Sequence, residues 1–216
     1  MHFEPRPIAY TIGCNLFRAY FRVSHRVKVH GRDLCPATGP LVIVSNHCSY
    51  LDPPLISVAY RFRRVRFMAK VELWGGCFLR WYLTNIGTIP VERGSGGREA
   101  IDIAVDVVNT GGCLGMFPEG TRSKTGELGR GRSGAIVIAA RTKAPLLPVY
   151  IEGSFESLPS GAKGVKFHPL VVYTGEPFEL TPEQCDLTDR TTMHATAEMV
   201  MGKIAAAKAK YVDDAV

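Results

Sequence analysis

The chain has 216 residues, of which 46% are hydrophobic, and it carries a formal net charge of +6 at pH 7. The length suits one domain with a sizeable core, and the basic balance favours a polyanionic partner: nucleic acid, an anionic membrane or a phosphorylated substrate. No CxxC pair occurs among the six cysteines, which argues against a zinc knuckle or a redox pair, so we expect neither a metal site nor a cofactor.

The first predicted element is a helix over residues 8–23. Its polar residues recur at steps of three and four on one side, at Asn15, Arg18, Arg22 and Arg26. Apolar residues fill the opposite side, yet the run is too short and too charged to span a bilayer. We interpret residues 1–36 as an amphipathic segment in the membrane interface, with arginines toward the headgroups and aromatic residues in the acyl boundary. A helix packed on the domain is the alternative interpretation.

From residue 37 onward, predicted strands alternate with predicted helices. The strands are expected at 41–45, 65–70, 87–93, 113–117 and 145–151, with one or two more between 165 and 173. The helices are expected at 53–60, 72–85, 98–110, 132–143 and, after a possible capping box at Thr181 and Gln184, around 193–204. This alternation predicts an α/β domain over residues 37–216, with a largely parallel or mixed sheet flanked by helices and preceded by the amphipathic helix.

Polar clusters follow three of the predicted strands. Asn46 and His47 come directly after strand 41–45 and precede Asp52, while a second cluster, Glu92-Arg93, ends the strand at 87–93. The third cluster is the run PEGTRS at 118–123. Open α/β sheets bind ligands beyond the carboxyl ends of their strands, so we expect the three clusters to meet at one site.

His47 and Asp52 are the candidate catalytic residues. Five positions apart, they would not share a face of a regular helix, so they can meet only if the loop folds back to a helix that begins near Asp52. The Pro53-Pro54 pair favours such a stop. The Asp52 carboxylate would then fix the tautomer of His47 and raise its basicity, and His47 could take a proton from a substrate hydroxyl. No GxSxG motif is present, so we expect no covalent enzyme intermediate.

Positively charged residues near the same strand ends could bind a phosphate group: Lys70, Arg93 and Arg122. In the 118–123 run, Gly120 permits close approach of a ligand, and Thr121 and Ser123 offer hydroxyl donors. We interpret Glu119 as a residue that holds one of the arginines or binds a substrate hydroxyl.

With these motifs the chain resembles the 1-acylglycerol-3-phosphate acyltransferase family. The block NHxSxxD is matched at 46–52, and a block of glycine and apolar residues that leads to Glu-Arg is matched at 87–93. The block FPEGTRS is matched without exception at 117–123, and a proline-centred apolar strand is matched by APLLPVYIEG at 144–153. The resemblance covers about 40–155, which we take as the motif-bearing core.

The resemblance implies transfer of an acyl group from acyl-CoA or acyl-carrier protein to the free hydroxyl of 1-acylglycerol-3-phosphate, giving phosphatidate, in phospholipid biosynthesis. It implies His47 as the base and Asp52 as its partner, and it implies acceptor-binding roles for Arg93, Glu119, Gly120 and Arg122. We expect contact with a membrane surface, a peripheral location at the cytoplasmic face of the cell membrane, and no nucleic-acid partner.

Departures from the family pattern leave alternatives open. Gly131-Arg132 stands where relatives often have Phe-Lys, and Gly75-Gly76 stands where they often have a proline. The acceptor could therefore be another lyso-phospholipid or a lyso-aminolipid. A non-catalytic binder of anionic lipid or nucleic acid would need only the arginines, and a metal-dependent phosphoesterase would use His47, Asp52 and Glu119.

Overall fold

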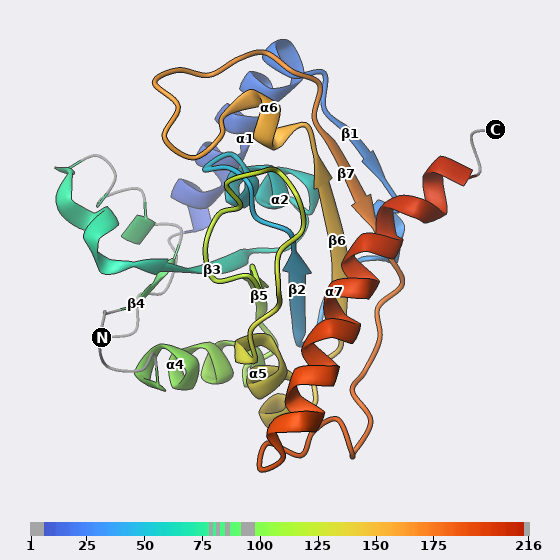
Figure 1. Ribbon diagram of the computed structural model, residues 1–216. Coiled ribbons are helices and arrows are strands. Elements are labelled where there is room, and N and C mark those ends of the chain that lie inside the picture. Colours follow the sequence, from blue (N-terminus) through green and yellow to red (C-terminus); the bar gives the residue numbers. More distant parts are fainter. Residues whose placement is uncertain (1–6, 78–79, 81–82, 85–86, 92–97, 214–216) are drawn as a thin grey trace.

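The computed structural model describes residues 7–77, 80, 83–84, 87–91 and 98–213. Within these ranges the strands form one sheet in the order β1-β7-β6-β2-β5-β3-β4 (Figure 1). The strands are β1 Lys28–His30, β2 Leu41–Ser45, β3 Val65–Lys70, β4 Ile89–Val91, β5 Cys113–Met116, β6 Leu146–Glu152 and β7 Val171–Thr174. Neighbours from β6 through β4 are parallel, whereas β7 is antiparallel to β6 and parallel to β1. The predicted α/β class with a largely parallel, mixed sheet is therefore confirmed.

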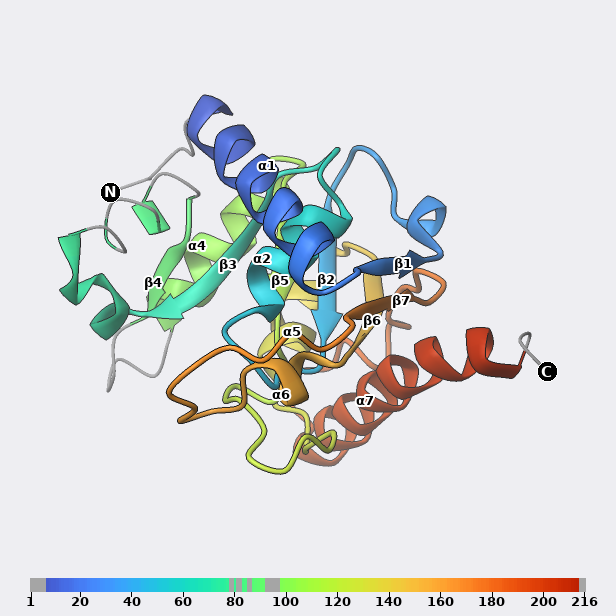
Figure 2. The same cartoon turned by 90° about the horizontal axis from the view of Figure 1, so that it is seen from above.

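Helices cover both faces of the sheet, as the view from above shows (Figure 2). The helical elements are α1 Pro7–Ser24, η1 Arg32–Leu34, α2 Asp52–Ala59, η2 Val71–Gly75, α4 Arg98–Asn109, α5 Gly134–Thr142, α6 Ser154–Ser157 and α7 Arg190–Asp213. Helices α1 and α2 pack on one face, and α4, α5 and α7 pack on the other. Strand β2 divides the two cores: Leu41 and Ile43 face the first, and Val42 and Val44 face the second. An unbroken apolar strand is what burial on both faces requires.

Helix α1 packs on the domain through its aromatic side rather than its aliphatic side. Phe21 is buried, and the Tyr10 hydroxyl accepts a hydrogen bond from the Val65 backbone N–H at 3.0 Å. The aliphatic residues of the helix form a separate exposed stripe: Ile8, Ile12, Leu16 and Val23. The expectation that the aromatic residues face lipid is therefore wrong for Tyr10 and Phe21. Within the described ranges, no helix combines the length and apolar character needed to cross a bilayer.

Three predicted elements differ from the structure by more than a few residues at their ends. The helix expected at 72–85 is interrupted, because η2 ends at Gly75 and Gly76 has an extended backbone. Thr181 and Gln184 do exchange the hydrogen bonds of a capping box, but they enclose only a turn. Helix α7 begins later, where Asp189 accepts hydrogen bonds from the next residues.

The third difference concerns the strand expected between 165 and 173. Strand β7 starts only at Val171, and residues 160–169 are exposed and not in a strand. The segment that precedes β7 therefore lies on the surface instead of in the sheet.

Candidate active site

Asn46 marks the point where the chain leaves the sheet after β2. Its side-chain Nδ2 donates to the Ile151 carbonyl at 2.9 Å, and its Oδ1 accepts from the Ile151 N–H at 2.7 Å. A buried amide therefore replaces one rung of the β2–β6 ladder. Because the side chain of Asn46 makes these bonds, the backbone is free to turn away and carry His47 over the end of the sheet.

His47 and Asp52 meet as a hydrogen-bonded pair. His47 Nδ1 lies 2.8 Å from Asp52 Oδ2, and the loop between them folds back so that Asp52 is the first residue of α2. The same Oδ2 accepts from the backbone N–H groups of Cys48 and Ser49, each at 2.8 Å. Asp52 is fully buried, and its other oxygen, Oδ1, has no hydrogen-bond partner among the described residues. Three donors thus hold one carboxylate oxygen in place.

The contact between His47 and Asp52 fixes the state of the imidazole ring. An ionised carboxylate only accepts hydrogen bonds, so Nδ1 carries the proton and Nε2 is left with a free lone pair. The His47 side chain is 17% exposed, whereas that of Asp52 is inaccessible. Part of the His47 side chain is therefore open to solvent, whereas the carboxylate that orients it is not.

Phe117 supports the ring of His47 from the end of β5. The two ring centroids are 4.0 Å apart and the planes are inclined by only 15°. Phe117 in turn stacks against Phe67 of β3, with centroids 5.9 Å apart. The stacked rings of Phe67 and Phe117 thereby hold the His47 imidazole in one orientation at the end of the sheet. Sequence reasoning did not assign this role to Phe117, although the residue opens the FPEGTRS block.

The 117–133 loop is joined to the backbone of His47 on both sides. The Ser123 N–H donates to the His47 carbonyl at 2.7 Å, and the His47 N–H donates to Glu119 Oε1 at 3.4 Å. Burial raises the pKa of Glu119 to about 7, although the His47 and Gly129 backbone N–H groups oppose this shift. In the described part of the chain, no arginine is within ion-pair distance of Glu119. The carboxyl group holds the backbone at His47 instead.

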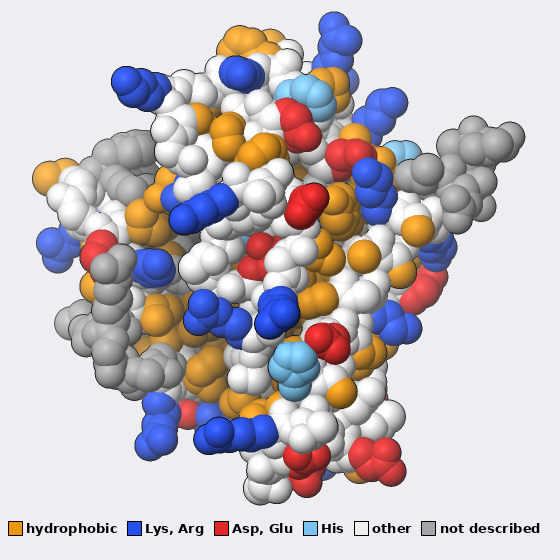
Figure 3. Space-filling view, viewed as in Figure 1, with side chains coloured by type: hydrophobic (Ala, Val, Ile, Leu, Met, Phe, Trp, Pro, Cys, Tyr) orange, Lys and Arg blue, Asp and Glu red, His pale blue; other side chains and the backbone are white. Residues whose placement is uncertain are grey.

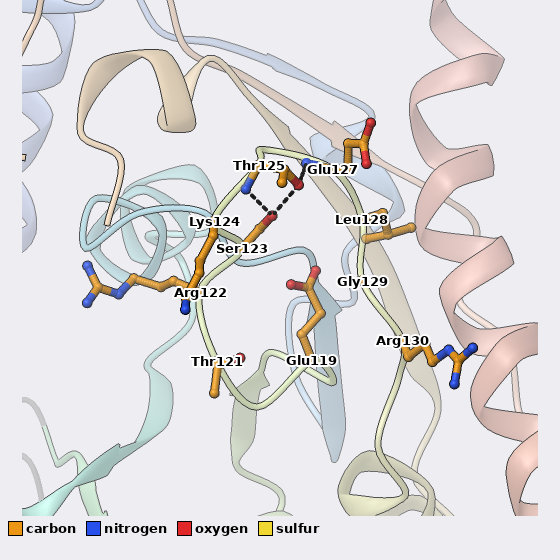
Figure 4. Close-up of a pocket in the computed structure, with 10 residues that line it drawn as sticks. All are labelled: Glu119, Thr121, Arg122, Ser123, Lys124, Thr125, Glu127, Leu128, Gly129 and Arg130. Atoms are coloured by element: carbon orange, nitrogen blue, oxygen red, sulfur yellow. Dashed lines mark hydrogen bonds between the residues drawn. The ribbon is translucent and has the colours of Figure 1, made fainter. Parts of the chain in front are cut away.

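The same loop lines an open pocket of about 370 Å³. Lys and Arg side chains lie on this face of the molecule, with acidic side chains among them (Figure 3). Glu119 points into the ring of the loop, whereas Arg122 and Arg130 point away from it on opposite sides (Figure 4). The Ser123 hydroxyl accepts hydrogen bonds from the Thr125 and Gly126 N–H groups at 3.3 and 3.1 Å, so it closes the loop on itself. In this structure the Ser123 hydroxyl therefore shapes the loop.

Arg122 and Arg132 place positive charge on the surface of the 117–133 loop. The Arg122 guanidinium lies over the Tyr50 ring, 3.6 Å from its centroid. Arg132 is exposed and runs across Gly120, where an added Cβ would come within 3.0 Å of the Arg132 side chain. Gly120 also has a φ of +70°, which favours glycine. Thr121 is exposed at the rim. Sequence reasoning noted Arg132 only as a departure, yet it lies on the motif.

Lys70 is not joined to this cluster by any described contact. Lys70 is exposed at the end of β3, and no described residue is hydrogen-bonded or ion-paired with its ammonium group. Arg93 and its neighbour Glu92 lie outside the described residues. No group of three or more His, Cys, Asp or Glu side chains in the described ranges is arranged to hold a metal ion.

The fold and the site define an α/β protein with a buried-carboxylate–histidine pair and a basic loop at the carboxyl edge of its sheet. Residues 26–152 match the family model described as Acyltransferase, and the chain belongs to the acyltransferase family. This confirms the resemblance that the sequence motifs indicated.

Several proteins are similar to this chain. A chloroplastic 1-acyl-sn-glycerol-3-phosphate acyltransferase of Brassica napus is 32% identical over 149 residues, which are 67% of this chain and 42% of that protein. The chain therefore spans about two fifths of the length of this relative. A 1-acyl-sn-glycerol-3-phosphate acyltransferase of Bacillus subtilis is 29% identical over 168 residues, which are 78% of this chain and 81% of that protein.

A solved structure has the same fold. The crystal structure of the 1-acyl-sn-glycerophosphate acyltransferase PlsC from Thermotoga maritima aligns with a TM-score of 0.73 and 24% identity. The alignment covers 94% of this chain and 78% of that one. At this identity the likeness shows the fold alone.

Proposed function

We propose that this protein transfers an acyl group from a thioester donor, acyl-CoA or acyl-carrier protein, to the free hydroxyl of 1-acylglycerol-3-phosphate, giving phosphatidate. The pairing of His47 with Asp52 is the observation that carries the proposal, because it leaves an accessible basic nitrogen beside a fixed carboxylate. The printed names of the relatives in Brassica napus and Bacillus subtilis support the choice of acceptor.

In this mechanism the acceptor hydroxyl is the nucleophile. His47 Nε2 takes the hydroxyl proton as the oxygen attacks the thioester carbonyl, and the tetrahedral intermediate then expels the thiolate, which receives that proton from His47. Asp52 stabilises the imidazolium while the proton is held. General-base assistance of this kind contributes about 10² to 10⁴ in rate, and positioning of the acceptor beside His47 must supply much of the rest.

The acceptor phosphate binds, in this proposal, to the positive side chains around the loop. Arg122, which points out of the loop toward Tyr50, is the described residue that best suits a bidentate phosphate contact. The full set proposed to bind substrate is Lys70, Arg93, Glu119, Gly120, Thr121, Arg122 and Ser123. Of these, Glu119 and Ser123 act through the backbone of His47, which they hold in register with the acceptor.

The protein attaches, in this proposal, to the cytoplasmic face of the cell membrane as a peripheral protein, through α1 of the segment 1–36. Residues 37–216 form the acyltransferase domain, and β1 of the same N-terminal segment adds a strand to its sheet. The exposed stripe of α1 supports this, since Ile8, Ile12, Leu16 and Val23 are all in contact with solvent. Arg18 and Arg22 are exposed next to the stripe. An apolar stripe bordered by arginines is the composition of an interfacial helix.

Acyl transfer in detergent tests the proposal. Palmitoyl-CoA and palmitoyl-acyl-carrier protein are offered with lysophosphatidate to the wild type, to His47→Ala and to His194→Ala. His194 is a matched control because it is an exposed histidine on α7 whose ion-pair partner among the described residues is the exposed Glu198. We expect His47→Ala to lose at least about a hundredfold in kcat and His194→Ala to match the wild type. Equal activity of His47→Ala and the wild type would contradict the proposal.

A further inference from the structure

The segment at 158–170, between α6 and β7, combines exposed apolar and basic side chains. Residues 160–169 are all exposed, and they include Phe167, whose side chain is 71% exposed, and Val165. The segment also carries Lys163 and Lys166, and no acidic residue occurs between Glu156 and Glu176. Exposed apolar and basic side chains on one segment suit a partner that is both apolar and negatively charged.

The segment is nonetheless firmly attached to the domain. The Lys166 N–H donates to the Ser157 carbonyl at 2.8 Å, which closes the neck of the segment. At its far end, His25 Nδ1 lies 2.9 Å from the His168 carbonyl, and the Leu170 N–H donates to the His25 carbonyl at 3.0 Å. Phe167 is therefore exposed on a segment that hydrogen bonds fix to the domain.

His25 also connects the segment to α1. It is buried, it follows the last residue of α1, and its ring meets the edge of the Phe167 ring at 5.8 Å. The exposed stripe of α1 ends at Val23, two residues before His25. In Figure 1 the segment lies at the same end of the molecule as the C-terminal end of α1. Apolar and basic side chains lie next to each other at this end in Figure 3.

We propose that the 158–170 segment and the exposed stripe of α1 form one docking face for an anionic lipid bilayer. Phe167 enters the acyl boundary, and Lys163 and Lys166 bind the headgroup phosphates. The inference rests on the proposed function, because an enzyme of lysophosphatidate must meet its acceptor at a membrane. The charge of the segment selects anionic lipid as the partner. Two attachment points joined by His25 fix the tilt of the domain, so the edge of the sheet that carries His47 is held at a constant angle to the bilayer.

Binding to vesicles tests this face. The full chain is sedimented with vesicles of equal parts phosphatidylcholine and phosphatidylglycerol, and with vesicles of phosphatidylcholine alone. We expect Phe167→Ala to lower the partition coefficient by about tenfold on the mixed vesicles. Replacing both Lys163 and Lys166 by alanine should lower it by about tenfold as well, at low salt and only when phosphatidylglycerol is present.

Lys203→Ala is the matched control, because Lys203 is exposed on α7, which covers the opposite face of the sheet. It should bind as the wild type does. The inference is overturned if Phe167→Ala and the double lysine variant both bind as tightly as Lys203→Ala, or if the wild type binds neither vesicle. Acyl transfer by the wild type in detergent micelles is measured in parallel. Vesicle binding without transfer in micelles would count against the proposed function and leave the docking face standing.

Discussion

The guanidinium carbon of Arg122 lies 3.6 Å from the centre of the Tyr50 ring. Tyr50 belongs to the loop between His47 and Asp52, and Arg122 belongs to the 117–133 loop. This contact therefore joins the loop of the proposed catalytic pair to the arginine that we propose binds the acceptor phosphate. An aromatic face holds a guanidinium in one plane while leaving its N–H groups free to bind an anion. Tyr50 is therefore a positioning residue for Arg122.

Replacing Tyr50 by leucine should weaken binding of a phosphorylated acceptor, since Arg122 loses the surface that orients it. We expect KM for lysophosphatidate to rise by about two- to fivefold, the range of an exposed cation–π contact, with little change in kcat. Tyr50→Phe keeps the ring and should keep KM. A neutral acceptor such as monoacylglycerol should show no difference between the variants. An equal rise in KM for both acceptors would mean that Tyr50 supports the loop in general and not Arg122.

The variant Asp52→Asn tests the charge of Asp52 separately from the geometry of the His47–Asp52 pair. All three hydrogen bonds to Asp52 fall on Oδ2, so an asparagine can keep its carbonyl oxygen there and still accept them. The charge that stabilises the imidazolium is lost, and we expect kcat to fall at least about a hundredfold. Asp52→Ala should lose activity and also stability, because two buried N–H groups lose their acceptor at about 1–3 kcal/mol each.

Measurements of kcat and of thermal unfolding for Asp52→Asn and Asp52→Ala test this prediction. The asparagine variant should melt closer to the wild type than the alanine variant does. If Asp52→Asn retains the wild-type kcat, then the carboxylate serves only to shape the loop.

Glu119 should make stability depend on pH. Burial raises its folded-state pKa from 4.5 to about 7, so the folded protein holds this proton more tightly than the unfolded chain. The associated stabilisation is fully present below about pH 4.5 and is lost as pH rises through about 7. Glu119→Gln removes the titration, so the melting temperature of the variant minus that of the wild type should increase between pH 5 and pH 8. A constant difference across this range would show that Glu119 titrates at its ordinary pKa.

Gly131 should not accept the phenylalanine that the family pattern often has there. A Cβ added at Gly131 would lie 2.8 Å from Cγ of Met201 on α7 and 3.1 Å from the Ala197 carbonyl. Gly131→Phe should therefore lower the free energy of unfolding by about 1–3 kcal/mol through overpacking. Combining it with Met201→Ala should recover part of this loss, which denaturant unfolding of the single and double variants will measure. Additive losses would show that Met201 does not occupy the space in question.

The sequence predicted the strand at 41–45 and the meeting of His47 with Asp52 because both depend on local chemistry. A β-branched apolar run specifies a buried strand, and a proline pair after Asp52 limits where the following helix can begin. The contacts of Phe117 with His47 and of Tyr50 with Arg122 join residues about seventy positions apart. No local pattern marks such pairs, so only the packed structure brings them out.

The first helix shows a different limit of sequence reasoning. Helix α1 has two apolar sides, one aromatic around Tyr10 and Phe21 and one aliphatic around Ile12 and Leu16. Periodicity reports that a side is apolar, but it does not report which side meets a complementary surface. Here α2 and the start of β3 offer that surface to the aromatic side. The aliphatic side is consequently the one that meets the solvent.

His47 has both of its backbone polar groups bonded to one loop, through Ser123 and Glu119. In the proposed mechanism, acceptor binding and proton transfer therefore both depend on this loop, and a mutation that reshapes the loop would also move His47. A substitution of Glu119 or Ser123 that changes the acceptor preference would therefore also lower kcat. Natural or engineered variation in acceptor choice should accumulate instead at Thr121, whose exposed side chain can change without disturbing either bond.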